Sequence, residues 1–169
     1  MRQFQLFKRG LNYYNVLLLI ICVLSGCKKD LNYNYAFNLN GTAERGDNYT
    51  AVYSFDTAAG LREFVADFYI GSFTDSNYVQ ISFSGNSYIA PGTYYTGITN
   101  PGNTICSFAY NNKHTYYTNV TGILEILQMD TVLHVVKGNF QFKSVNALTP
   151  ADSVTVTDGG FASVKYTVQ

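Results

Sequence analysis

The sequence predicts an all-β fold, a single antiparallel domain in the form of a β-sandwich or a barrel-like sheet. Apolar and polar residues alternate with a period of two over many segments, as they do in strands that bury one face. Short clusters of Gly, Asn, Asp and Pro separate these segments at the spacing of antiparallel hairpins. Helical periodicity is almost absent: Gly60 interrupts the one candidate, so we expect at most a single turn near Ala58.

The chain begins with the pattern of a secretory signal peptide. Arg2, Lys8 and Arg9 precede any acidic residue, and residues 16–24 form an uncharged apolar run. That run is far shorter than the roughly 20 residues that a helix needs to cross a bilayer. A permanent transmembrane helix is therefore the poorer interpretation.

The apolar run ends in Leu24-Ser25-Gly26-Cys27, which resembles the lipobox of bacterial lipoproteins. The resemblance implies that Leu24, Ser25 and Gly26 are recognised by the signal peptidase and that Cys27 carries the lipid. Each buried methylene contributes about 0.8 kcal/mol, so two or three acyl chains give a lasting membrane anchor. The alternatives are an ordinary secretory signal with an incidental cysteine, or a buried helix. The expected organisation is a signal peptide at residues 1–26, a short tether at 27–31 and the all-β domain at 32–169.

The residues after Cys27 bear on location within the cell envelope. Lys28 follows Cys27, whereas an Asp there is associated with inner-membrane retention in enterobacteria, so we expect the outer membrane. Lipoproteins that Bacteroidota display on the cell surface tend to resemble one another in having several acidic residues just after the lipid cysteine. In this chain Lys28-Lys29-Asp30 supplies one acidic residue. The sequence leaves open whether the domain faces the periplasm or the outside.

The composition limits the partners and the redox chemistry. The whole chain is formally neutral, and removal of the basic leader leaves a mildly acidic domain. Nucleic acid is therefore not an expected partner, since its binding depends on basic patches. Cys106 is the one cysteine left after loss of Cys22 and lipidation of Cys27, so no intrachain disulfide is expected. Its place in an apolar alternating run predicts a small buried residue rather than a nucleophile.

The expected strands account for most of the chain after Leu31. The clearest alternation is at residues 33–39, 78–84, 136–143 and 161–168. Six further segments have strand composition, at residues 49–55, 63–70, 92–95, 104–110, 122–129 and 153–157. The expected turns are at residues 40–41, 71–77, 85–86, 101–103, 111–112 and 158–160.

A series of short motifs rich in Gly, Thr and aromatic residues, taken in their order along this chain, resembles a family of Bacteroidota lipoproteins of uncharacterised function, the DUF6252-like proteins. The motifs are Phe37-x-x-Asn40-Gly41-Thr42, Pro91-Gly92-Thr93-Tyr94, Gly122-x-Leu124-x-Ile126, Asp130, Lys137-Gly138-Asn139-Phe140-x-Phe142, and Val154-x-Val156-Thr157-Asp158-Gly159-Gly160-Phe161. The family usually has a Trp soon after the first Gly-Thr, whereas this chain has Tyr49 a few residues later and no Trp. The resemblance implies an exported all-β lipoprotein and supplies no catalytic residues.

No catalytic or metal-binding constellation stands out. His114 is expected in a turn and His134 on a strand face, and no Ser lies in a Gly-x-Ser-x-Gly elbow. No zinc pattern is present, and we expect no metal or other cofactor. Loop carboxylates resemble no known calcium loop; the pairs are Glu44 with Asp47, and Asp152 with Asp158. A glycosidase would need two converging carboxylates, for which the candidates are Glu63, Asp67, Glu125 and Asp130.

Tyrosine is the unusual component, because aromatic residues make up 16% of the chain. If Tyr94-Tyr95 and Tyr116-Tyr117 lie in strands, each pair places one ring on the outward face. Such rings could bind a sugar or a partner protein, although Tyr also simply suits half-buried strands.

Three functions remain open. The favoured one is a non-enzymatic, membrane-anchored envelope lipoprotein that binds a glycan, a peptide or an envelope protein. The first alternative is a carboxylate-based hydrolase that acts on glycans, and it requires two carboxylates in one pocket. The second is a structural or assembly lipoprotein, which an exposed strand edge or apolar patch would favour.

Overall fold

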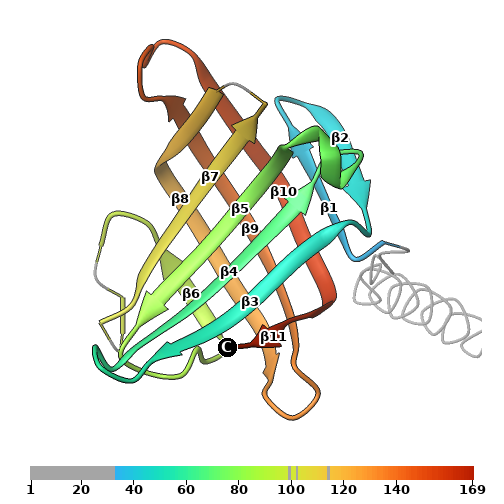
Figure 1. Cartoon of the computed structure of the whole chain (residues 1–169). Helices are drawn as coiled ribbons and strands as arrows, with labels where there is room; N and C mark the ends of the chain where they lie inside the picture. The colour runs from blue at the N-terminus through green and yellow to red at the C-terminus, as the bar shows by residue number, and fades with distance from the viewer. Residues whose placement is uncertain (1–32, 99, 102, 114) are drawn as a thin grey trace, which may run out of the picture. The chain divides into compact units, whose positions relative to one another are not determined.

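The computed structural model describes residues 33–98, 100–101, 103–113 and 115–169, which form an all-β domain (Figure 1). The predicted signal peptide, the lipobox cysteine Cys27 and the whole of the expected tether lie outside the described residues, as does His114.

Strands occur at all ten predicted segments, and the described residues contain eleven strands in total. They are β1 (Tyr35–Leu39), β2 (Thr42–Gly46), β3 (Tyr49–Asp56), β4 (Leu61–Tyr69), β5 (Asn77–Gly85), β6 (Gly92–Tyr95), β7 (Ile105–Asn112), β8 (Thr115–Asp130), β9 (Val135–Asn146), β10 (Ser153–Lys165) and β11 (Thr167–Val168). A short 3₁₀ turn, η1 (Phe73–Asp75), follows β4. The segment after Asp56 is only a turn, whose amides at Ala58 and Ala59 are bound by the Asp56 carboxylate.

All the strands belong to one sheet that curls into a half-barrel (Figure 1). Its order is β11-β3-β4-β5-β7-β8-β9-β10-β1-β2, with β6 paired to β8 beside this path. Neighbouring strands are antiparallel except β11, which runs parallel to β3. The all-β prediction is therefore confirmed, in its barrel-like form rather than as a sandwich, and the sheet is antiparallel apart from the β11–β3 pair.

Contacts across the open side of the half-barrel hold β3 and β4 against β10 and β1. The Tyr35 hydroxyl on β1 donates to the Tyr69 carbonyl at the end of β4. The amide of Lys165 donates to the Tyr49 hydroxyl on β3 at 3.0 Å. At the other end, the chain leaves β10 and joins β3 as β11, where the Gln169 amide donates to the Tyr53 carbonyl at 2.9 Å.

The core fills the concave side of the sheet and is strongly aromatic. Phe68 on β4 stacks on Phe140 of β9 with ring centroids 5.9 Å apart, and on Phe161 of β10 at 5.6 Å. These rings therefore join strands that are far apart in the sheet order. The largest fully buried side chains in the described part include Tyr35, Phe64, Phe68, Phe161, Ile81 and Leu124.

Two predicted turns are strand in the structure. Residues 158–160 lie inside β10, which continues through a bulge between Val156 and Gly159. Asp158 has φ +51° there, so the residue that resembles a turn residue is used to bulge a strand. Asn111 and Asn112 end β7, and the turn begins at Lys113.

His134 is also placed differently from the prediction. It lies in the β8–β9 turn with φ +52°, not on a strand face. The apolar residues around it, Val132 and Leu133, are 86% and 70% exposed. They gave the segment a strand-like composition although no face of it is buried.

Candidate functional site

The outward-facing tyrosines were the sequence's candidates for binding, and each pair has one ring on the surface. Tyr95 on β6 is 47% exposed, whereas Tyr94 is in the core, its ring 4.4 Å from that of Phe83. Tyr116 on β8 is 50% exposed, whereas Tyr117 is buried and donates to the Asp152 carboxylate at 2.8 Å. Each pair therefore alternates as predicted, with Tyr94 and Tyr117 in the core and Tyr95 and Tyr116 on the surface.

The two exposed rings do not form one site. Tyr95 pairs with Ile123 of β8, and Tyr116 lies seven residues before Ile123 on β8, a separation of about 23 Å along an extended strand. Tyr116 instead belongs to a row of residues that pair across neighbouring strands on the outer face. It pairs with Asn111 of β7, which pairs with Tyr78 of β5, which in turn pairs with Tyr69 of β4. The row lies on the convex surface, and none of its four residues lines either of the two hollows described next.

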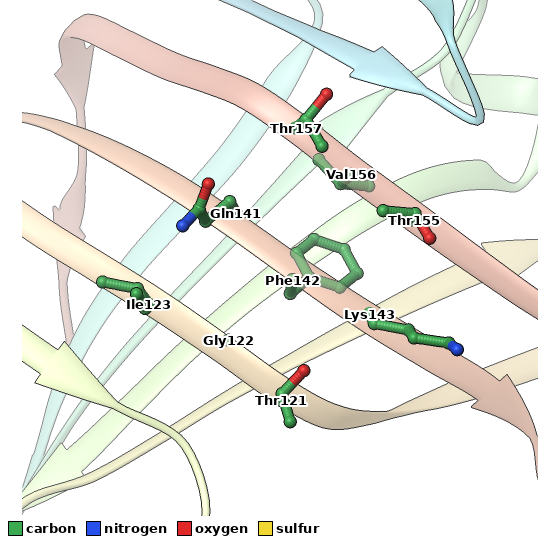
Figure 2. Close-up of a pocket in the computed structure, with 9 residues that line it drawn as sticks. All are labelled: Thr121, Gly122, Ile123, Gln141, Phe142, Lys143, Thr155, Val156 and Thr157. Carbon is green, nitrogen blue, oxygen red and sulfur yellow. The ribbon is translucent and has the colours of Figure 1, made fainter.

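One hollow lies on the convex face of β8, β9 and β10, with a volume of about 290 Å³. Figure 2 shows its lining, in which Thr121, Lys143 and Thr155 lie side by side across the three strands. Phe142 turns its ring inward, so its backbone forms the floor. The hollow is shallow and Lys143 is its one charged side chain. We name it the outer hollow.

A larger pocket of about 580 Å³ lies at the end of the half-barrel where β11 joins β3. In Figure 1 this is the end that carries the C-terminus and the β8–β9 turn. The volume falls within the range of small-molecule sites. We name it the end pocket, and it is lined by Tyr53, Phe55, Arg62, Tyr88, Thr131, His134, Tyr166 and Val168.

Arg62 is the cationic centre of the end pocket. It shares the inward face of β4 with Phe64, and it stands opposite Phe55 of β3 in the strand register. Its guanidinium carbon lies 4.1 Å from the ring centroid of Phe55 and 3.8 Å from that of Tyr88. Two cation–π contacts at this distance hold the side chain in place, and they use the face of the guanidinium rather than the N–H groups along its edge.

No carboxylate in the described part of the chain forms an ion pair with Arg62. The aspartates that end β3 and β8 are occupied by their own turns. Asp56 binds the amides of Ala58 and Ala59, and Asp130 binds those of Val132 and Leu133 at 2.9 and 2.7 Å. The positive charge therefore remains uncompensated within the pocket.

Tyr53 supplies a buried polar group beside Arg62. The residue is 7% exposed, and its hydroxyl forms no hydrogen bond of acceptable geometry in the described structure. Burial raises the pKa of Tyr53, and polar contact with Arg62 opposes that rise. Even with Arg62 as a donor, the hydroxyl hydrogen has no acceptor, which is costly for a buried group.

Tyr166 forms the inner wall of the end pocket. Its ring lies 5.9 Å from that of Tyr53 and 6.0 Å from that of Phe64. Its hydroxyl donates to the Asp130 carbonyl at 3.2 Å. The exposed His134 ring lies 5.3 Å from Tyr166, at the rim. The wall is therefore fixed by packing and offers a flat apolar surface.

None of the carboxylates considered for hydrolysis lines either hollow. Asp67 accepts from Gln80 at 2.9 Å on the outer face, and burial raises its pKa. Glu125 accepts from Asn139 at 2.8 Å, and Asp130 caps its own turn. Neither the outer hollow nor the end pocket has an Asp or Glu in its lining.

The loop carboxylates considered for calcium are also separate. Asp47 accepts from the Asn34 amide and Asp158 from the Asn38 side chain. Asp152 binds Tyr117 and Asn146 at the start of β10. Among the described residues, no three His, Cys, Asp or Glu side chains are grouped as metal ligands.

Cys106 is 2% exposed in the core, as predicted, and burial raises its pKa to about 12. A thiol that keeps its proton is a poor nucleophile. In the part of the chain that the structure describes, no helix has the length and apolar character needed to cross a membrane.

The sequence does not indicate the end pocket because its residues come from five separate places. Tyr53, Phe55 and Arg62 lie on two neighbouring strands, but Tyr88 comes from the β5–β6 loop and Tyr166 from the end of the chain. The one local signal is Arg62, a charged residue on the face of β4 that otherwise carries Phe64, Ala66 and Phe68. A basic residue at the end of an apolar face marks the place where that face meets solvent.

A comparison with family models finds a match to the description "Domain of unknown function (DUF6252)" over residues 63–165. The match runs from β4 to the end of β10 and takes in more than half of the chain. Neither the curated proteins nor the solved structures include a match. The chain therefore belongs to the DUF6252 family.

Proposed function

We propose that this chain is a lipoprotein of the Bacteroidota type, anchored in the cell envelope through Cys27, and that it binds a small ligand without transforming it. The end pocket is the observation that carries the binding role. Its size, its aromatic walls and its few converging polar groups are those of a ligand site. We place the protein at the outer membrane, with the periplasmic and outward orientations both open.

The alternative of a carboxylate-based hydrolase has less support. That chemistry needs two carboxylates about 5–9.5 Å apart around the substrate, and the end pocket is lined by neither Asp nor Glu. Tyr95 and Tyr116 are exposed but lie on separate parts of the surface, so an extended glycan surface also has less support than the end pocket.

Fractionation of cells tests the anchor. We expect the wild-type protein to be membrane-bound with the mass of an acylated chain that starts at Cys27, and Cys27→Ser to become soluble. External protease on whole cells then distinguishes the outward from the periplasmic orientation. A Cys27→Ser protein that stays in the membrane with unchanged mass would contradict the anchor.

Blocking the end pocket tests the binding role. Val168→Trp places a large ring at the pocket's rim, where Val168 is 55% exposed. The matched control is Leu148→Trp, because Leu148 is 94% exposed and lies outside both hollows. We screen the wild-type chain in nonionic detergent against envelope glycans and small metabolites, and expect hits that Val168→Trp abolishes and Leu148→Trp keeps. Hits that survive Val168→Trp would place binding elsewhere.

A further inference from the structure

We propose that the end pocket selects ligands that carry an oxyanion, namely a carboxylate, sulfate or phosphate group, and that Arg62 and Tyr53 bind that group. This inference rests on the proposed binding function and adds the chemical class of the ligand. Three features of the pocket carry it: a fixed cation, a buried donor without an acceptor, and an apolar wall beside them.

The geometry of Arg62 suits an oxyanion better than a neutral polar group. Phe55 and Tyr88 occupy positions 4.1 and 3.8 Å from the guanidinium carbon, so the side chain is held before any ligand arrives. A guanidinium presents two parallel N–H groups along one edge, which match the two oxygens of a carboxylate or an ester-linked sulfate or phosphate. Because the ring contacts already immobilise the side chain, less conformational entropy is lost on binding.

The hydroxyl of Tyr53 adds a second donor at the same place. It is buried next to Arg62, and its hydrogen has no acceptor among the described residues. An oxyanion placed on the Arg62 edge would accept from it, so one ligand group would relieve both the uncompensated charge and the unsatisfied hydroxyl. A neutral apolar ligand would relieve neither.

The remainder of the pocket indicates what carries the oxyanion. Tyr166 provides a flat buried wall, and Val168 extends it toward solvent. With a volume of about 580 Å³ the pocket has room for a ring beside the oxyanion. We therefore expect a cyclic or otherwise flat small molecule with one acidic substituent.

The outer hollow is the competing place for an anion, because it contains Lys143. That side chain is exposed, and no unpartnered buried hydroxyl lies in the lining of the outer hollow. Lys143→Gln is therefore a matched control for Arg62→Gln: each variant removes one positive charge, from the outer hollow or from the end pocket.

Saturation-transfer NMR on the full mature chain in nonionic detergent tests the proposal. The probes are benzoate, phenyl sulfate and phenyl phosphate, with benzyl alcohol as the neutral analogue. We expect at least one anionic probe to bind at least tenfold more tightly than benzyl alcohol, and the order of the three affinities to show which oxyanion the pocket prefers. Arg62→Gln should abolish that preference, Arg62→Lys should keep part of it, Tyr53→Phe should weaken it several-fold, and Lys143→Gln should leave it unchanged.

The outcomes separate this inference from the proposed function. If benzyl alcohol binds as tightly as the anions and the Val168→Trp variant binds none of them, the pocket binds ligands but does not select anions. The inference then fails while the proposed binding function stands. If the preference survives Arg62→Gln, or no anionic probe binds at tens of millimolar, the inference also fails. Arg62→Lys keeps the charge and stem, so it serves as the folded reference should Arg62→Gln lose its native circular dichroism spectrum.

Discussion

At the scale of single residues, close contacts of the backbone with aromatic rings limit the size of the side chain that fits at some positions of the sheet. Gly138 on β9 pairs with Phe161 of β10, and the ring of Phe161 covers the glycine. A methyl group at position 138 would overlap the Glu125 carbonyl oxygen and lie 2.7 Å from Cζ of Phe161. The carbonyl belongs to the backbone of β8, so it cannot move aside as a flexible side chain would.

We therefore expect Gly138→Ala to lower the free energy of unfolding by about 1–3 kcal/mol, the usual cost of overpacking a core. Chemical denaturation followed by circular dichroism measures the change. Lys137→Ala, one residue earlier and exposed, is the control and should remain within about 0.5 kcal/mol of the wild type. Equal stability of Gly138→Ala and wild type would show that β8 and β9 are not packed as closely as described.

The tyrosine pairs show what alternation along a strand does and does not determine. The period of two places Tyr94 and Tyr95 on opposite faces, and Tyr116 and Tyr117 likewise. Which member is buried depends on pairing with distant strands, such as β6 with β8, and the local sequence does not contain that register. The same reason explains why the surroundings of Arg62 could not be predicted.

At the scale of elements, β10 shows how one strand combines two predicted ones. Asp158-Gly159-Gly160 has the composition of a hairpin turn, yet the residues before and after it belong to one strand, β10, and the chain keeps its direction. Asp158 adopts the left-handed conformation at φ +51°, and its carboxylate accepts from Asn38 of β1 at 2.8 Å. A bulge and a turn need the same residue types, so local composition cannot separate them.

This bulge predicts a specific sensitivity at position 158. Asp158→Val introduces a β-branched side chain at positive φ, where the strain is about 1–2 kcal/mol, and it also removes the hydrogen bond to Asn38. We expect the free energy of unfolding to fall by at least that amount, measured by urea denaturation. Asp158→Asn, which tolerates this conformation, should cost less, and Thr155→Val on the same strand is a control at an ordinary φ. Equal losses in Asp158→Val and Thr155→Val would contradict the account.

The two-residue strand β11 closes the end of the half-barrel that contains the end pocket. The Gln169 amide donates to the Tyr53 carbonyl at 2.9 Å, and the Phe55 amide donates to the Gln169 carbonyl at 3.3 Å. Both acceptor and donor on β3 belong to residues that line the end pocket. The last residues of the chain therefore shape the site as well as the sheet.

Deletion of residues 167–169 should therefore affect the end pocket more than the fold. We expect the amide of Phe55 to lose hydrogen-exchange protection, with a loss of global stability of about 1–3 kcal/mol for the missing ladder hydrogen bonds. Amides in the centre of β9 should stay protected to the level of global unfolding. Unchanged protection at Phe55 would show that β11 does not close the sheet in solution.

At the scale of the whole molecule, the all-β class and the ten strand segments follow from alternation and turn residues, which leave a sandwich and a barrel-like sheet equally open. The closure does not follow, because it depends on long-range contacts such as Tyr35 with Tyr69 and β11 with β3. The end pocket exists only because of that closure. Sequence patterns that repeat every two residues describe a strand, whereas the pocket depends on which strands meet at an end of the sheet.

The aromatic core makes alkaline pH a probe of the whole fold. Burial is the main cause that raises the pKa of both Tyr35 and Cys106 to about 12. It also raises the pKa of four further core tyrosines, Tyr53, Tyr94, Tyr110 and Tyr166. An unfolded chain ionises these groups near their ordinary pKa values, about 8.5 for Cys and about 10 for Tyr. Between those values and the raised ones, the unfolded chain binds fewer protons than the folded chain. By linkage, the free energy of unfolding must then fall as pH rises.

We therefore expect the urea midpoint to decrease progressively above about pH 9, and tyrosinate absorbance at 295 nm from the buried rings to appear together with the loss of circular dichroism. Tyr35→Phe removes one raised pKa, so it should reduce the slope of stability against pH in the alkaline range, whatever its effect at neutral pH. A midpoint that stays constant to pH 11, or tyrosine ionisation that is complete while the sheet remains folded, would show that these hydroxyls are in contact with water. The core would then not be the closed aromatic interior that Tyr35 and β11 complete.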